Sequence, residues 1–317
     1  MKKIVNILMF VLVLLLSVVS FTACSEKEVI GIIQFGEHDS LNDCYNGMIK
    51  GLKSELGDEY NKYKIDLQNS NFEASTSASQ ANTFVSKNVK IIGAIATPTA
   101  MAAATAAKGT IPVVYCAVSD PVSAGLTTMR NVTGSSDVLD FDSQLALIKK
   151  FIPDVQKIGV LYTMSEENSL SQIETLTTKA NELGIEIVRQ AVTNASEIPT
   201  ATDTLLAKNI DCITNLTDNT VVGALDVILP KTNAKGIPVF GSEIDQVKNG
   251  CLASASLDYV ALGEQTGIIM AKILKGEVVA SNDIAIKVED SFNCYSQKVL
   301  DQLQITAPDL TGIQNVD

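Results

Sequence analysis

From residue 29 onward, short apolar runs rich in β-branched residues alternate with longer segments in which apolar residues recur at the helical period. Such runs predict strands buried on both faces, and their alternation with helices predicts β-α units that build a parallel sheet. A first series predicts strands at 29–35, 64–69, 91–97, 111–118 and 131–135, and helices at 41–56, 73–87 and 98–107.

A second series predicts strands at 157–163, 186–192, 211–217 and 237–243, and helices at 166–183, 196–207 and 220–234. A strand at 251–257, a helix at 259–274 and a strand at 284–289 would let the chain return to the first unit and cross back. We therefore expect an α/β protein of two Rossmann-like lobes with parallel sheets, joined by three crossovers near 135–136, 257–258 and 282–283. The N-terminal lobe would hold residues 29–135 and 258–282, and the C-terminal lobe 136–257 and 283–317. Short polar crossovers suit a hinge between closing lobes.

The first 24 residues depart from this pattern. Lys2 and Lys3 precede an apolar run at 7–16, and Phe21-Thr22-Ala23-Cys24 follows, which predicts a signal peptide over residues 1–23. The tetrad resembles a bacterial lipobox, so we expect lipid on Cys24, a tether at 24–28 and an extracytoplasmic protein anchored to the outer face of the cell membrane. An uncleaved anchor is the alternative, because residues 4–23 approach the roughly 20 residues of a spanning helix.

Net charge and composition limit the kinds of partner and ligand contact that the protein can have. Without residues 1–23 the chain keeps 22 basic and 36 acidic side chains, a net charge of −14, which argues against nucleic acid as a partner. The remaining 294 residues suit two medium domains. Arg130 and Arg189 are the only arginines and tryptophan is absent, so a ligand must be held without arginine clamps or indole platforms.

Five further cysteines are widely spaced and form no C-x-x-C pair, which indicates neither a disulfide framework nor a zinc site, and no metal is expected. Cys116 and Cys212 lie in apolar runs and are predicted to be small buried hydrophobes. The sequence leaves open whether these cysteines form one or two disulfide bridges.

Polar residues follow several predicted strands, where open parallel sheets bind their ligands. Thr97 before Pro98 predicts a helix N-cap with free amides that could receive a carboxylate, and an ordinary capped helix explains the pair equally well. Asp120 follows the next strand and is also explained by a turn. Acidic clusters after strands of the second half could bind an ammonium group, so together the two halves suit a zwitterion.

Catalysis finds little support in the sequence. His38 follows the first strand, but no serine or cysteine beside it is specified as a nucleophile. Phosphate-binding, zinc-protease and serine-hydrolase motifs are absent, and nothing fixes the separation of acid pairs such as Glu243 and Asp245. We expect no enzyme activity and no cofactor.

Motifs spread over nearly all of the mature chain resemble those of ABC-transporter substrate-binding lipoproteins of the tryptophan/tyrosine type. They include Ile30-Gly31-Ile32-Ile33-Gln34-Phe35 with Glu37-His38, Ala96-Thr97-Pro98, Ser119-Asp120-Pro121, Asn131-Val132-Thr133-Gly134, Lys157-Ile158-Gly159-Val160-Leu161-Tyr162, Thr217-Asp218-Asn219-Thr220, Ile237-Pro238-Val239-Phe240 and Gly263-Glu264-Gln265-Thr266-Gly267.

The resemblance implies a type I periplasmic-binding-protein fold whose lobes close over a small solute, most simply an L-amino acid with an aromatic or other apolar side chain. The partners implied are a membrane permease and its ATPase, and we expect a monomer. The ligand wall carried over by the resemblance comprises Phe35, Thr97, Pro98, Asp120, Tyr162, Asn168, Asp218, Asn219 and Glu243.

Within that wall, Thr97 would receive the ligand carboxylate and Asp218 the ammonium, while Phe35 and Tyr162 would give apolar faces. Ser242 and Glu243 stand where the family usually has glycine and aspartate, which affects substrate identity most. Two alternatives remain: a ligand-sensing or adhesive surface lipoprotein without transport, and an importer receptor for sugars or nucleosides.

Overall fold

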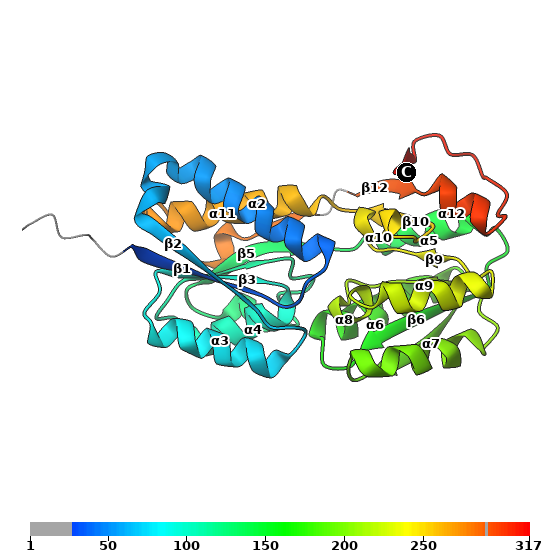
Figure 1. The fold of residues 1–317 in the computed structure, drawn as a ribbon, viewed down its shortest axis with the longest axis horizontal. Coiled ribbons are helices and arrows are strands. Elements are labelled where there is room, and N and C mark those ends of the chain that lie inside the picture. The colour runs from blue at the N-terminus through cyan, green and yellow to red at the C-terminus, as the bar shows by residue number, and fades with distance from the viewer. Residues whose placement is uncertain (1–26, 289–290) are drawn as a thin grey trace, which may run out of the picture.

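Two lobes lie end to end along the long axis of the molecule in the computed structural model (Figure 1). The structure describes residues 27–288 and 291–317, so the predicted signal segment and Cys24 lie outside the described residues. Each lobe has one sheet with helices on both faces. The predicted α/β fold of two lobes is confirmed.

The sheet of the N-terminal lobe has the strand order β11-β5-β4-β3-β1-β2, and every pairing in it is parallel. Its strands are β1 (Glu28–Gln34), β2 (Tyr63–Asn69), β3 (Ile91–Ile95), β4 (Val113–Cys116), β5 (Val132–Asp137) and β11 (Ile286–Val288). Its helices are α2 (Asp39–Leu56), α3 (Ala74–Ser86), α4 (Thr97–Ala107) and α11 (Tyr259–Leu274), with short 3₁₀ turns η2 (Gly57–Lys62), η3 (Leu126–Thr128) and η5 (Asn282–Ile284).

The sheet of the C-terminal lobe has the order β13-β12-β10-β9-β8-β6-β7, in which only the β10–β12 pairing is antiparallel. Its strands are β6 (Lys157–Thr163), β7 (Glu186–Val192), β8 (Cys212–Thr214), β9 (Val239–Phe240), β10 (Ala253–Ser256), β12 (Phe292–Tyr295) and β13 (Gln314–Asn315). Its helices are α5 (Phe141–Phe151), α6 (Glu167–Glu182), α7 (Ile198–Leu206), α8 (Asn219–Val222), α9 (Leu225–Ala234), α10 (Ile244–Lys248) and α12 (Gln297–Gln302), with a 3₁₀ turn η4 (Ala195–Glu197).

Two of the three crossovers lie later in the chain than predicted. β5 continues to Asp137, and β11 pairs with it in register, with Ile286 opposite Ser135. Both strands therefore belong to the N-terminal sheet, and the chain leaves that lobe after Asp137 and again after Val288. The predicted boundaries at 135–136 and 282–283 are wrong because the end of β5 is polar, Ser135-Ser136-Asp137, although it is buried within the sheet.

Helices α2 and α11 pack unusually closely on one face of the N-terminal sheet. Each carries two glycines four residues apart on the shared side. A Cβ atom added to Gly47 would lie 2.1 Å from the carbonyl oxygen of Val260, and one added to Gly267 would lie 2.1 Å from that of Met48. The backbones of the two helices therefore touch, and no side chain larger than hydrogen can stand between them.

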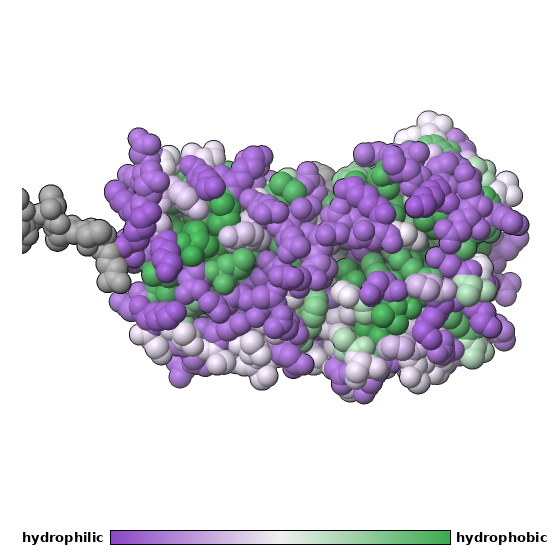
Figure 2. Space-filling view, in the orientation of Figure 1, coloured by the Kyte–Doolittle hydropathy of each residue, from purple (hydrophilic) through white to green (hydrophobic). Residues whose placement is uncertain are grey.

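Apolar cores fill both faces of each sheet. All five cysteines within the described residues are free thiols and buried, which confirms the prediction for Cys116 and Cys212. Hydrophilic side chains cover most of the face seen in Figure 2, where the two lobes touch along their common border.

Candidate functional site

The carboxyl ends of strands from both sheets face each other across the boundary between the lobes and enclose a small cavity of about 20 Å³. Both lobes contribute to its wall. The lining residues are His38, Ser40, Leu41, Ala117, Asp137, Asn168, Thr217, Asn219, Val222, Ser242, Glu243, Gln246 and Tyr259. Two of them are carboxylic acids and none is a lysine or arginine, so the cavity is acidic.

The N-terminal lobe presents the start of α2 to this cavity. Ser40 and Leu41 lie in its first turn, where backbone N–H groups have no acceptor within the helix. The loop before them is fixed by Gln34, whose Nε2 donates to the carbonyl of Gly36 at 2.8 Å and to Oδ1 of Asn42 at 2.8 Å. The start of α2 therefore offers oriented amide donors and the positive end of a helix dipole.

Backbone strain gathers at the same edge of the N-terminal sheet. Phe72, Ala96 and Ala117 follow β2, β3 and β4, and their φ angles are 62°, 82° and 57°. Such angles are unusual for residues with a side chain and cost about 1–3 kcal/mol each, so they persist only where the surrounding structure imposes them. Strained residues of this kind cluster at binding sites.

Asp137, at the end of β5, is the buried acid nearest the crossover. Its carboxylate accepts hydrogen bonds from Ser119 Oγ at 3.1 Å and from the Tyr259 hydroxyl at 2.8 Å. Burial raises the pKa of Asp137 to about 6, against the opposing effect of these donors. Ser119 also bonds to Thr217 Oγ1 of the other lobe at 2.9 Å, so Asp137 is connected to the interface between the lobes.

Across the cavity, in the C-terminal lobe, two asparagines lie beside a buried acid, Glu166. Asn219 donates its backbone N–H to Glu166 Oε2 at 3.0 Å and its side-chain N–H at 2.6 Å, while Thr220 donates to Oε1. Burial, with the neighbouring carboxylate of Asp218, raises the pKa of Glu166 to about 8. Asn168 donates to the carbonyl of Thr217 at 2.7 Å. Glu166 is not among the predicted site residues, because its partners Asn219 and Thr220 are more than fifty residues away in the chain.

Glu243 lines the cavity from the start of α10, where its carboxylate accepts the backbone N–H of Asp245 at 2.6 Å and of Gln246 at 2.8 Å. Burial and the nearby carboxylate of Asp245 raise its pKa to about 7. The Ser40 hydroxyl of the other lobe, beside this carboxylate, partly opposes that rise in pKa. Glu243 therefore caps a helix and joins the lobes as well.

Three of the predicted wall residues, Asn168, Asn219 and Glu243, line the cavity. Thr97 and Pro98 are buried at the start of α4, where Ala96 rather than Thr97 is the N-cap, and Thr97 Oγ1 has no hydrogen-bond partner. The other predicted residues have contacts outside the cavity. Phe35 packs edge-on against Phe72, and Tyr162 packs against the core of its own lobe.

Asp218 has a different role from the predicted one. Its carboxylate accepts hydrogen bonds from the backbone N–H and hydroxyl of Thr163, from Ser169 Oγ at 2.7 Å, and from the backbone N–H of Val221 at 2.9 Å. These donors occupy both of its oxygens and belong to the same lobe. Asp218 therefore caps α8 and ties it to β6, which leaves no free oxygen for an ammonium group.

Asp120 lies at the rim of the lobe boundary. It accepts the backbone N–H of Ser123 at 3.0 Å and, from the other lobe, the hydroxyl of Ser171 at 2.7 Å. These contacts lower its pKa despite partial burial. A second contact at the boundary runs from Asn249 to Asp39 at 2.7 Å. Hydrogen bonds between the lobes thus join the rims as well as the interior.

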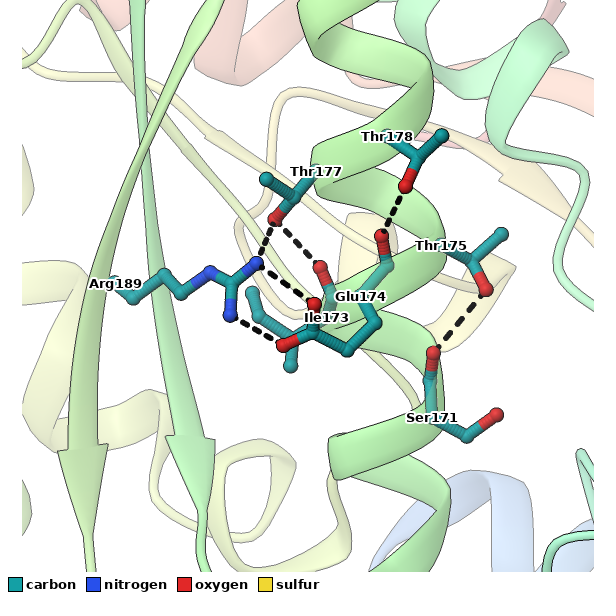
Figure 3. Close-up of polar contacts among 7 residues, drawn as sticks. All are labelled: Ser171, Ile173, Glu174, Thr175, Thr177, Thr178 and Arg189. Atoms are coloured by element: carbon teal, nitrogen blue, oxygen red, sulfur yellow. Dashed lines mark hydrogen bonds and ion pairs between the residues drawn. The ribbon is translucent and has the colours of Figure 1, made fainter.

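Arg189 is not part of the cavity wall and is paired with α6. Figure 3 shows its guanidinium, on β7, directed at α6, where it contacts both carboxylate oxygens of Glu174 and donates to Thr177 Oγ1 at 2.7 Å.

Within the described ranges, no group of three or more His, Cys, Asp or Glu could hold a metal ion. Of the helices described, none is long and apolar enough to cross a membrane.

A two-lobed α/β protein with an acidic, largely enclosed cavity between its sheets has the design of a solute-binding protein. Residues 29–313 match the family described as ABC transporter substrate binding protein. The chain belongs to this family and is a substrate-binding protein of an ABC transporter, a class that works outside the cytoplasm.

Among the relatives, a tyrosine-binding protein of Clostridioides difficile is 35% identical, over 93% of this chain and 87% of its own length. A Streptococcus pneumoniae ABC domain in complex with L-Trp is 31% identical and superposes with a TM-score of 0.87, over 92% of this chain and 100% of that one. These relatives are solute-binding proteins rather than enzymes.

A third relative allows the arrangement of the two lobes to be compared with that of an open protein. The ligand-free, open structure of a Clostridium difficile substrate-binding protein with adhesive properties is 33% identical, and it covers 92% of this chain and 99% of its own length. It superposes with a TM-score of only 0.66. Because the identities of the two solved structures are nearly equal, the lobes here are arranged more like those of the L-Trp complex than like those of the open protein.

Proposed function

We propose that this protein captures an L-amino acid with an aromatic or other apolar side chain between its lobes and delivers it to an ABC permease driven by an ATPase. The observation that carries the proposal is the buried carboxylate of Asp137, which lines an interlobe cavity without any lysine or arginine. The tyrosine-binding and L-Trp-bound relatives support the ligand class.

The ammonium group of the ligand binds Asp137 in this proposal. Asp137 accepts only two side-chain hydrogen bonds, whereas a carboxylate offers about four lone-pair sites. The ligand carboxylate binds the free amides of Ser40 and Leu41 at the start of α2, where the helix dipole favours an anion. Asn168, Asn219 and Glu243 complete the wall.

Closure follows from contacts to both lobes. Asp137 and α2 belong to the N-terminal lobe, while Asn168 and Glu243 belong to the C-terminal lobe. A ligand that contacts both sides binds the closed arrangement more tightly than the open one, so it shifts the population toward closure. A cavity of about 20 Å³ holds little more than a water molecule, so entry of an amino acid requires the lobes to separate.

Two matched variants test the assignment in a fragment of residues 25–317, which contains every described element. Asp137→Asn should weaken amino-acid binding by about 1–3 kcal/mol, because a charge-assisted hydrogen bond is lost. Asp218→Asn should leave the affinity of the folded protein unchanged and lower its stability, because that carboxylate bonds only within its own lobe. Calorimetry in which Asp137→Asn binds as tightly as the wild type would remove Asp137 from the site.

The anchoring part of the proposal rests on the sequence. We infer lipid on Cys24 that holds a monomeric receptor beside its permease, with several acyl chains where one would bind only marginally. Cys24→Ala should abolish lipid labelling and release the protein from membranes while ligand binding is retained. Membrane retention of the unlabelled variant would favour an uncleaved anchor.

A surface role without transport is the second candidate. It is supported by the relative described as a substrate-binding protein with adhesive properties. Deletion of the gene should reduce amino-acid uptake by cells if the protein serves an importer. Unchanged uptake together with reduced surface attachment would favour the second candidate.

A further inference from the structure

Two residues of the cavity wall each have a buried polar atom without a hydrogen-bond partner: His38 at Nδ1 and Asn168 at Oδ1. A buried polar atom without a partner costs about 1–3 kcal/mol, and native structures rarely retain one without a reason. The two residues come from different lobes, and both line the cavity. A ligand between the lobes is the natural source of the missing partners.

The hydrogen-bond network determines which kind of partner His38 needs. Glu166 accepts the side-chain N–H of Asn219, so Oδ1 of Asn219 is turned away from that acid. This oxygen lies 3.4 Å from Nε2 of His38. Since an amide oxygen only accepts, Nε2 of His38 carries the proton, and Nδ1 of the neutral ring is an acceptor.

The ring remains neutral at physiological pH. Burial lowers the pKa of His38 to about 4, and the Asn219 hydrogen bond and the carboxylates of Asp39 and Asp245 only partly oppose this effect. Protonation of Glu166 would leave the orientation of Asn219 unchanged. The new O–H at Oε1 could donate to the hydroxyl of Thr220, and Oε2 would still accept the side-chain N–H of Asn219.

Asn168 is oriented in the same manner. Its Nδ2 donates to the carbonyl of Thr217, so its unpartnered Oδ1 is a second acceptor. With the carboxylate of Asp137, the wall therefore contains three groups that can accept further hydrogen bonds.

The surroundings of His38 suit an aromatic side chain. The rings of His38 and Phe72 are parallel within 4°, with centroids 6.4 Å apart, and Phe35 packs edge-on against Phe72 at 6.0 Å. Leu41 and Val222 add apolar surface to the cavity wall. An aromatic ring that carries a polar hydrogen at its edge matches this combination of apolar surface and unpartnered acceptor.

We propose that Nδ1 of His38 accepts a hydrogen bond from the ring O–H or N–H of the bound amino acid, so that the site selects tyrosine and tryptophan over phenylalanine. This inference rests on the proposed function and assigns the side-chain specificity of the same site.

The absence of tryptophan from the chain allows a direct measurement. Fluorescence of L-tryptophan added to the 25–317 fragment reports binding without background from protein tryptophan, and L-tyrosine and L-phenylalanine are measured by competition. The wild type should bind tryptophan and tyrosine roughly tenfold or more tightly than phenylalanine, since a polar group left unpaired in a buried site costs about 1–3 kcal/mol.

Two variants of His38 distinguish the roles of its two ring nitrogens. His38→Asn keeps an amide oxygen near the position of Nδ1 and should preserve the preference. His38→Gln places its amide near Nε2, keeps the contact to Asn219, and should weaken tyrosine and tryptophan binding roughly tenfold while phenylalanine changes by less than about twofold. As a control, Thr133→Val removes another buried, unpartnered polar atom outside the cavity and should change none of the affinities.

Each other outcome has a distinct meaning. If the wild type binds all three amino acids equally, or if His38→Gln weakens all three equally, the assignment of His38 to the side chain is wrong while amino-acid capture stands. If the wild type binds none of the three but binds an aliphatic amino acid such as L-leucine, the inference is wrong while amino-acid capture stands, and if it binds no apolar amino acid at all, the proposed function itself fails.

Discussion

Individual carboxylates in this protein show why residue type and position after a strand do not identify a ligand contact. Asp137 ends strand β5 and Asp218 follows strand β8, and both are buried. The donors around Asp218 satisfy it completely, whereas Asp137 retains free capacity and lines the cavity. The family resemblance assigned the ammonium to Asp218, and no local pattern pointed to Asp137, whose partners Ser119 and Tyr259 are distant in the chain.

His38 illustrates the same limit. The sequence shows only that His38 follows the first predicted strand, whereas its role as an acceptor depends on Asn219 and Glu166 of the other lobe. No local pattern could report a proton position that is set by a contact between lobes. Asn168, Asn219 and Glu243 were predicted as wall residues from the family resemblance, and they line the cavity because the loops at strand ends face the boundary in this fold.

Strain at Ala96 gives a prediction for a matched pair of substitutions. Ala94 and Ala96 are both buried, but only Ala96 has a positive φ, 82°, with ψ at 156°, a region that glycine alone adopts easily. Ala94→Gly should therefore destabilise the protein by about 2 kcal/mol more than Ala96→Gly, because the second change relieves strain. Urea denaturation of both variants measures the difference, and equal losses would show that Ala96 stores no strain.

Among the elements, the alternation of strands and helices was predictable, but their exact extent was not. The predicted helix 220–234 is two helices, α8 and α9, and α5, α10, α12, β12 and β13 were not foreseen. Several of these are short, and β12 pairs antiparallel, so the β-α alternation that reveals the rest of the fold does not extend to them.

Contact between α2 and α11 leads to a second prediction. Gly47→Ala should destabilise the protein by more than about 3 kcal/mol, because the new methyl group would meet a backbone carbonyl, which cannot move aside as a side chain can. Asn46→Ala, on the exposed side of the same helix, is the control and should change stability by less than about 0.5 kcal/mol. Thermal unfolding compares the two, and a tolerated alanine at position 47 would mean that the helices can separate.

The same packing affects the site. The start of α2 presents Ser40 and Leu41 to the cavity, and the start of α11 presents Tyr259, which donates to Asp137. Because the helices touch along their backbones, these groups move as one body. The amides proposed for the ligand carboxylate and the acid proposed for its ammonium therefore keep a fixed separation.

At the scale of the whole molecule, buried acids predict an unusual dependence of stability on pH. The pKa values of Glu166 and Glu243 are raised from 4.5 to about 8 and about 7. Between roughly pH 6.5 and 8.5 the folded protein therefore binds more protons than the unfolded chain, so the free energy of unfolding should fall as pH rises, by about 2 kcal/mol. The lowered pKa of His38 acts below this range.

Urea titrations at the two ends of this pH range measure the change. Glu166→Gln should flatten the dependence whatever its effect on stability at a single pH. A free energy of unfolding that is constant or increases over the range would show that these acids are ionised in the folded protein at neutral pH.

The path of the chain has a further consequence for how the protein is made. The edge strand β11 of the N-terminal sheet and the partner of α2, α11, come from residues 259–288, which are synthesised after β6 to β10 of the other lobe. While the chain emerges, the glycine face of α2 therefore stays uncovered until the second lobe has most of its strands. The lobe that begins the sequence is not completed until nearly the whole chain has been made.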